Sequence, residues 1–139
     1  MACDNLVPWL EDHTLYKMRT RPGNESAHQV QKLLFVCGHN QRRSVTAERL
    51  FQGCAAYEVR SAGTERGATI RVSEELLEWA DVIFVMEENH LQRLWQKFKP
   101  FLKGKRLVNL QIPDQYGAMA PELFEVLRER LSLYIWVPD

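Results

Sequence analysis

The sequence has no long apolar run and no excess of charge of either sign. Its apolar stretches are far shorter than the roughly 20 residues of a membrane-spanning helix, and its first residues lack the basic start and apolar middle of a secretory signal. Eighteen Lys and Arg residues balance eighteen Asp and Glu residues, so the broad positive surface of nucleic-acid-binding proteins is missing. The sequence predicts a cytoplasmic protein with no membrane partner and no nucleic-acid partner.

Cysteine is also scarce. The three cysteines, Cys3, Cys37 and Cys54, show no Cys-x-x-Cys spacing and have no matching histidine pair, which argues against a disulfide framework and a tetrahedral zinc site. No metal and no organic cofactor are expected. Cys54 completes an apolar helix face and is predicted to lie in the core, whereas Cys3 is predicted to be an exposed thiol.

The length and composition suit one domain. A chain of 139 residues that is 45% hydrophobic can bury a single core. Residues 1–31 show no sustained periodicity and include the turn-rich stretch "RTRPGNES", so they are predicted to form a loosely packed or disordered arm. Residues 32–139 are predicted to form the domain, and a monomer is favoured.

From residue 32 onwards, short apolar segments alternate with amphipathic ones. Strands are predicted at 33–37, 57–63, 81–86 and 106–112, with helices between them; Ser73 is a candidate N-cap and Pro121 a candidate first helical residue. Four strands alternating with helices predict an α/β fold with a parallel sheet and helices on both faces. In such sheets ligands bind at the carboxyl ends of the strands, which is where Cys37 and Gly38 lie.

Polar residues crowd the end of the first strand. Cys37 is followed by five residues, Gly-His-Asn-Gln-Arg, and then by Arg43 and Ser44. Backbone N–H groups of a glycine-containing turn and of a helix N-terminus can surround a phosphate, and Arg43 can donate two parallel hydrogen bonds to it. The helix end and the arginine also stabilise a thiolate, to which Ser44 could donate. A nucleophile that faces an anion site is typical of covalent phosphoryl transfer.

With these residues the sequence resembles the low-molecular-weight protein tyrosine phosphatases, whose signature is a cysteine, five residues and Arg-Ser directly after the first strand. Three further segments are similar to family segments and occur in the same order: "SAGT" at 61–64, "ADVIFVMEENHLQRL" at 80–94 and "IPDQYG" at 112–117. The resemblance spans residue 32 to about residue 131. It implies a flavodoxin-like fold with a four-stranded parallel sheet, and a hydrolase that acts on phosphotyrosine or related phosphate monoesters.

The resemblance also implies roles for individual residues. Cys37 corresponds to the nucleophile, Arg43 to the phosphate clamp and Asp114 to the general acid. Asn40 is expected to hold the loop in a left-handed turn, and His39 to contribute its backbone N–H rather than its side chain. The predicted substrate-binding residues are Gly38, His39, Asn40, Gln41, Arg42, Ser44 and the aromatic wall Tyr116.

Two positions depart from the family pattern. Gln115 replaces the proline of the family's Asp-Pro-Tyr segment, which predicts a less rigid acid loop. Arg42 replaces a cysteine that many relatives carry immediately before the arginine and that can protect the nucleophile as a reversible disulfide. That protection is therefore expected to be missing, and Arg42 itself is predicted to be a solvated charge.

Two other functions fit parts of the pattern. A thiol-dependent arsenate reductase would need further cysteines placed to resolve its arsenic-bound intermediate, and a catalytically silent module would bind a phosphate or a phosphoprotein without turnover. The partner in the favoured interpretation is a phosphorylated protein or a small phosphate monoester, and the sequence does not separate the two. The apolar C-terminal stretch "SLYIWVPD" is predicted to pack on the domain, with self-association as the alternative.

Overall fold

The structure, a computed structural model, describes residues 30–138. The predictions for Cys3 and for the arm lie outside these residues, except that Gln31 already belongs to the first strand. The elements in chain order are β1 (Gln31–Cys37), α2 (Arg43–Leu50), β2 (Tyr57–Gly63), α3 (Glu74–Trp79), β3 (Val82–Val85), α4 (Glu88–Leu102), β4 (Arg106–Asn109) and α5 (Pro121–Leu131).

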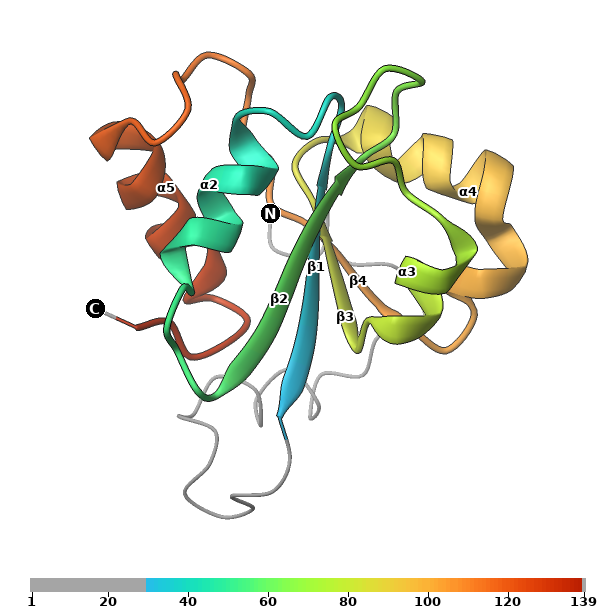
Figure 1. The fold of residues 1–139 in the computed structure, drawn as a ribbon, viewed down its shortest axis with the longest axis horizontal. Helices are drawn as coiled ribbons and strands as arrows, with labels where there is room; N and C mark the ends of the chain where they lie inside the picture. Colours follow the sequence, from blue (N-terminus) through green and yellow to red (C-terminus); the bar gives the residue numbers. More distant parts are fainter. Residues whose placement is uncertain (1–29, 139) are drawn as a thin grey trace.

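The four strands form one parallel sheet in the order β2-β1-β3-β4 (Figure 1). Cys37 lies opposite Gly63 of β2, and Val36 lies opposite Val85 of β3. The carboxyl ends of the three strands therefore meet at one edge. The predicted α/β, flavodoxin-like fold is confirmed.

Helices cover both faces of the sheet. Figure 1 shows α2 and α5 on one side and α3 and α4 on the other. Because successive strand residues point to opposite faces, Leu33, Phe35 and Cys37 join the core under α2 and α5, whereas Leu34 and Val36 join the core under α3 and α4. Within residues 30–138, no helix is both long and apolar enough to cross a bilayer.

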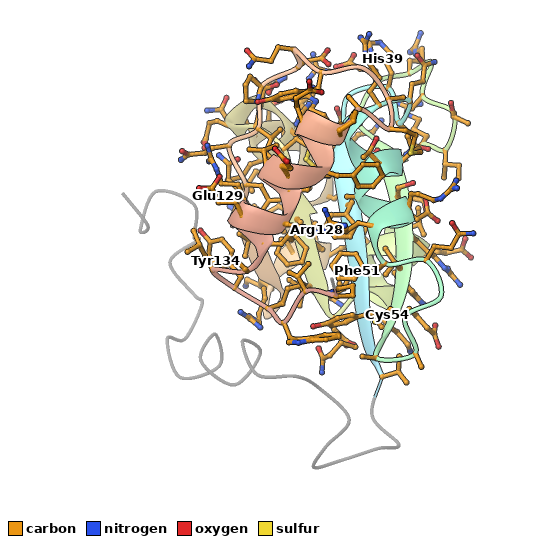
Figure 2. All side chains as sticks on the ribbon, turned by 90° about the vertical axis from the view of Figure 1, so that its left-hand side faces the viewer. His39, Phe51, Cys54, Arg128, Glu129 and Tyr134 are labelled. Carbon is orange, nitrogen blue, oxygen red and sulfur yellow. The ribbon has the colours of Figure 1, made fainter. Side chains whose placement is uncertain are left out.

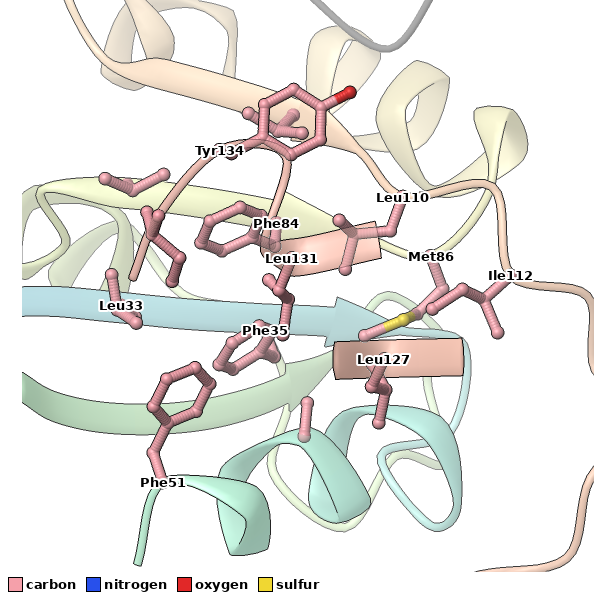
Figure 3. Close-up of a cluster of buried hydrophobic side chains, with 14 of the residues drawn as sticks. Leu33, Phe35, Phe51, Phe84, Met86, Leu110, Ile112, Leu127, Leu131 and Tyr134 are labelled. Atoms are coloured by element: carbon pink, nitrogen blue, oxygen red, sulfur yellow. The ribbon is translucent and has the colours of Figure 1, made fainter. Parts of the chain in front are cut away.

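Aromatic rings fill the core under α2 and α5. The ring of Phe35 stacks on Phe84, with centroids 5.2 Å apart, and on Phe51, with centroids 5.7 Å apart (Figure 3). Tyr134 and Ile135 are buried in the same core. The C-terminal segment packs on the domain, as predicted.

Two predicted elements end early. β4 stops at Asn109 because Gln111 has a left-handed backbone with φ of 56° and donates its N–H to Asn109 Oδ1 at 2.9 Å. Helix α2 stops at Leu50 and is followed by a turn in which Gly53 has φ of 81°. Cys54 thus lies beyond the helix and is half-buried at the edge of the core rather than inside it, which corrects the prediction.

Candidate functional site

The loop of residues 38–42 joins β1 to α2 and is held in place by its carbonyl groups. The carbonyls of residues 37–39 accept hydrogen bonds from the N–H groups of Thr64, Glu65 and Thr69 at 2.9, 2.9 and 3.1 Å. The backbone N–H groups of residues 39–43, in contrast, have no hydrogen-bond acceptor anywhere in residues 30–138. Successive free N–H groups at the start of a helix form an anion-binding site.

The close approach of β2 to this loop requires glycine at position 63. A Cβ at Gly63 would collide with the carbonyl oxygen of Gly38 and would lie 2.6 Å from Ala68 Cβ. A Cβ at Gly38 would meet only ordinary contacts, the nearest being Glu65 Cγ at 3.6 Å. The position that requires glycine is therefore Gly63, in "SAGT", and not Gly38 in the loop itself.

Asn40 adopts the predicted left-handed conformation, with φ of 58°. Asparagine tolerates this region better than most residues because its short side chain can bond locally. Its Nδ2 donates to Ser44 Oγ at 2.8 Å, and its Oδ1 accepts from Ile70 N at 3.2 Å. Asn40 is buried and links the loop both to α2 and to the chain that follows β2.

The Cys37 thiol lies at the base of the loop. Its Sγ is 3.0 Å from Ser44 Oγ, and both residues are buried. Since Ser44 Oγ already accepts from Asn40, its own hydrogen is available to the sulfur. This hydrogen bond fixes the position of the sulfur at the N-terminus of α2. The side chains of His39 and Gln41 are exposed at the rim.

Arg43 is only 5% exposed and is held from one side. Its Nη1 donates to Glu87 Oε1 at 2.7 Å and to the Ile112 carbonyl at 2.8 Å. Both bonds use Nη1, so within residues 30–138 Nε and Nη2 donate no hydrogen bond, and the nearest carboxylate to the edge that they form is Asp114, whose Oδ1 lies 3.8 Å from Nε. Two parallel donors on that edge match two oxygens of a phosphate.

Glu87 and His90 are site residues that the sequence analysis missed. Glu87 caps α4, and its N–H donates to Nδ1 of His90 at 3.1 Å. His90 is 1% exposed; burial, and then the positive charge of Arg43, lower its pKa to about 4, so it is neutral at neutral pH. A signal was present, because Glu87 follows the apolar strand β3 at the same sheet edge as Cys37.

Asp114 lies opposite the loop, on the chain that follows β4. Its Oδ2 is 3.4 Å from Arg42 Nη2, and its Oδ1 is 3.8 Å from Arg43 Nε. The Asp114 side chain is 43% exposed, which leaves it accessible from solvent. The Arg42 side chain is 55% exposed, as predicted for a solvated charge, and it also contacts Asp114. Tyr116 is half-buried and packs against the core under α2 and α5.

Cys54 is remote from the site. Figure 2 shows His39 and Cys54 at opposite ends of the molecule. Cys54 precedes Tyr57, which pairs with Gln31 at the other end of β1 from Cys37, and seven strand residues span about 20 Å. A disulfide needs Cα atoms within about 7 Å of each other. Within residues 30–138, no three His, Cys, Asp or Glu side chains could together hold a metal ion.

No protein-family model matches the chain, and neither does any curated protein sequence. Solved structures do match. A mutant of the YwlE arginine phosphatase, in which serine replaces a cysteine and the active-site serine is phosphorylated, has a TM-score of 0.61 and 22% identity over 74% of this chain and 92% of its own. The tyrosine phosphatase Wzb from Escherichia coli K30, solved with phosphate, has a TM-score of 0.60 and 19% identity over 73% of this chain and 94% of its own.

A third structure carries the name of the family that the sequence resembles. It is the low-molecular-weight protein tyrosine phosphatase from T. tengcongensis, with a TM-score of 0.57 and 19% identity over 75% of this chain and 95% of its own. At identities this low, the structural similarity establishes the fold alone. Residues 30–138 therefore have the fold of the low-molecular-weight protein tyrosine phosphatases, as the sequence resemblance predicted.

Proposed function

We propose that this protein is a cysteine-dependent phosphatase that hydrolyses phosphotyrosine or related aryl phosphate monoesters through a thiophosphate intermediate. The observation that carries the proposal is the arrangement at the base of the loop. The Cys37 thiol lies 3.0 Å from Ser44 Oγ at the start of a loop in which five successive backbone N–H groups have no acceptor within residues 30–138. The loop ends at Arg43, whose protein hydrogen bonds use Nη1 only. Similarity to solved phosphatases supports it.

In the first step the Cys37 thiolate attacks phosphorus. The sulfur–phosphorus bond forms as the ester phosphorus–oxygen bond breaks, while the loop N–H groups and the Nε–Nη2 edge of Arg43 bind the phosphoryl oxygens. Asp114 gives its proton to the departing phenol oxygen. Its place opposite the loop, within 3.8 Å of Arg43, supports this role.

In the second step water attacks the phosphorus of the thiophosphate. Asp114, now a carboxylate, takes a proton from that water, the sulfur–phosphorus bond breaks, and the Cys37 thiolate and inorganic phosphate are released. Neither step requires a metal or an organic cofactor. Ser44 stabilises the thiolate before the first step and after the second, because its hydroxyl lies within hydrogen-bond distance of the sulfur.

A second substrate, phosphoarginine, is favoured by one observation. The similar structures include an arginine phosphatase as well as tyrosine phosphatases. The two substrates present the same phosphoryl group to Cys37 and Arg43 and differ only in the leaving group. Initial rates with a phosphotyrosine peptide and a phosphoarginine peptide of the same sequence distinguish them directly.

The geometry disfavours the arsenate reductase interpretation. That chemistry requires a second thiol within reach of the first, and within residues 30–138 the one other cysteine, Cys54, lies at the far end of the sheet from Cys37, about 20 Å away. Cys3 lies outside the described residues. A silent binding module and an enzyme would both bind phosphate in the same loop. Only a measurement of turnover distinguishes them.

The test is hydrolysis of an aryl phosphate by Cys37→Ser and Cys54→Ser variants. We expect no turnover in the first and unchanged turnover in the second, since Cys54 is a half-buried thiol remote from the loop. Absence of turnover in the wild-type protein, with phosphate still bound, would favour the binding module. Loss of activity in both variants would overturn the assignment of Cys37 as sole nucleophile.

A further inference from the structure

A cavity opens beside the proposed catalytic loop. It has a volume of about 230 Å³ and lies between the loop of residues 64–73 and the exposed face of α4. Figure 1 shows that this loop and the start of α4 reach the same end of the sheet as the end of β1. Its lining includes Thr64, Arg71, Arg93, Lys97 and Phe98.

Positive charge gathers around this cavity. Arg71, Arg93 and Lys97 all line it, and within residues 30–138 only Arg93 has a carboxylate partner, Glu65, at 3.5 Å. Three positive charges and the one negative charge of Glu65 leave a net charge of two. Like charges at one cavity repel one another, and a doubly negative ligand would relieve that repulsion.

A buried hydroxyl adds a hydrogen-bonding group. Thr64 lines the cavity, and its Oγ1 is buried without a hydrogen-bond partner in the described part of the chain. A buried hydroxyl without a partner is unfavourable. Rotation of Thr64 about χ1 to another staggered position would turn this oxygen towards an acceptor in the cavity.

The cavity borders the proposed catalytic loop but is separate from it. The N–H of Thr64 donates to the Cys37 carbonyl at 2.9 Å, so the inner wall is directly behind the nucleophile's backbone. None of the cavity's cations takes part in the contacts of Arg43 or Asp114. A ligand here would lie beside a phosphoryl group bound at residues 38–43, not in its place.

We propose that this cavity is a second anion site that binds a phosphate group through Arg71, Arg93 and Lys97. The dianionic charge of phosphate equals the net charge of the lining with Glu65 included, and guanidinium and ammonium groups are its usual partners. The phosphate is either a second phosphoryl group of the substrate or a free small phosphate. The binding test does not depend on the proposed phosphatase activity.

The experiment is a sulfate titration of the ¹⁵N-labelled full chain followed by NMR. We expect two separately saturating sets of amide shifts, one over residues 38–43 and one over residues 64, 71 and 93–97. The double variant Arg71→Gln/Lys97→Gln should weaken binding at the second set at least ten-fold and leave the first set unchanged. Both residues are exposed, so the fold should tolerate the changes.

The matched control is Arg66→Gln/Lys99→Gln. It removes the same charge from the same loop and the same helix, at exposed residues outside the cavity lining. It should leave both sets of shifts unchanged. The proposal is overturned if the second set does not shift in the wild-type protein, or if the control weakens binding there as much as the cavity variant does, because sulfate would then be responding to general surface charge.

A kinetic comparison then identifies the source of the phosphate. If the group belongs to the substrate, kcat/KM for a doubly phosphorylated peptide should exceed that for its singly phosphorylated form, and the cavity variant should remove the difference. If it is a free ion, the ratio should be the same in both proteins while the NMR shifts persist. The kinetic comparison follows the NMR titration, because it assigns a source only to a phosphate site that sulfate binding has already established.

Discussion

The two ends of the sheet are built from opposite kinds of residue. At the carboxyl end the fold buries Asn40, Arg43, Ser44 and His90, joined to one another and to Glu87 by hydrogen bonds. At the amino end the rings of Phe51, Tyr57 and Trp136 pack in series instead, with Tyr57 stacked on Trp136 at 6.4 Å between centroids.

The two ends differ in the free energy of burying their side chains, because polar groups lose their hydrogen bonds to water on burial and apolar rings do not. Burying a guanidinium and several polar groups is favourable only when their partners are complete, whereas buried rings stabilise mainly through the apolar area that they remove from water. The carboxyl end, where the proposed site lies, therefore depends on complete hydrogen-bond partners, and the amino end closes the core. Substitutions at the carboxyl end should therefore lower activity or stability more than matched substitutions elsewhere in the molecule.

The largest effect is expected at Arg43. Arg43→Ala should lower kcat/KM by roughly 100- to 1000-fold, the usual loss on removing a donor to a developing charge. Arg43→Lys should recover little, because an ammonium lacks the planar edge with two donors. Arg49→Ala, an exposed change near the other end of α2, is the control and should keep full activity. Equal rates for the Lys variant and wild type would contradict the two-donor geometry.

Asp114→Asn should slow hydrolysis of phosphotyrosine by about 100-fold, the scale of general acid catalysis. An aryl phosphate whose phenol is strongly acidic should be affected much less, because its leaving group needs no proton. Steady-state rates across a series of leaving groups measure this. The same loss for every substrate would mean that Asp114 orders the loop, through Arg42 and Arg43, without transferring a proton.

His90 should make the free energy of unfolding sensitive to acid. Its folded pKa of about 4 lies below the ordinary 6.5, so the unfolded chain binds the proton more readily between these values. Its contribution to the free energy of unfolding is complete above pH 6.5 and is lost as the pH falls towards 4. At pH 5 the loss should be about 2 kcal/mol.

The variant His90→Gln isolates this contribution. Glutamine keeps an acceptor for the Glu87 N–H, as in an ordinary capping box, but does not titrate. Urea unfolding at pH 7.5 and pH 5 should show a smaller loss of stability in the variant than in the wild type. Parallel losses in the two proteins would show that other groups cause the acid sensitivity.

Gly63→Ala should lower the free energy of unfolding by about 1–3 kcal/mol, as overpacking does, and should also lower kcat. The new methyl group would collide with the Gly38 carbonyl and with Ala68 Cβ and would displace the loop of residues 38–42. Gly38→Ala is the paired change and should cost less in both measurements, because only ordinary contacts await it. The reverse order would mean that the flexibility of the loop glycine matters more than the space at β2.

The smallest effect is expected at Arg42. Its contact with Asp114 joins two side chains that are about half exposed, and such pairs contribute no more than about 1 kcal/mol. Arg42→Gln should therefore lower kcat/KM by less than about five-fold. Arg66→Gln, which removes an exposed positive charge that has no contact with Asp114, should have no effect. A larger loss at Arg42 would show that it, rather than the absent proline, orders the acid loop.

Much of the fold was predictable because its signals are local. The strand over 57–63, the Ser73 cap and the Pro121 helix start occur where the sequence placed them, since apolar runs, caps and proline act over a few residues. The early end of β4 was not predictable from its apolar pattern, because the turn at Gln111 depends on a side-chain bond to Asn109.

The site was predictable only in part. The spacing from Cys37 to Ser44 is contained in one segment, so the sequence shows it directly. The contacts of Arg43 with Glu87 and Ile112 join residues 44 and 69 positions apart, and the contact of Arg42 with Asp114 spans 72 positions. Such pairs arise from strand order and register, which periodicity does not specify.

The central place of β1 has a consequence for opening motions. This strand is hydrogen-bonded to β2 along seven residue pairs and to β3 along four, so releasing it breaks both ladders together. Its inner amides, such as that of Phe35, should exchange with deuterium only through global unfolding. Cys37 is the last residue of the same strand. The position of the thiol should therefore persist for as long as the chain stays folded.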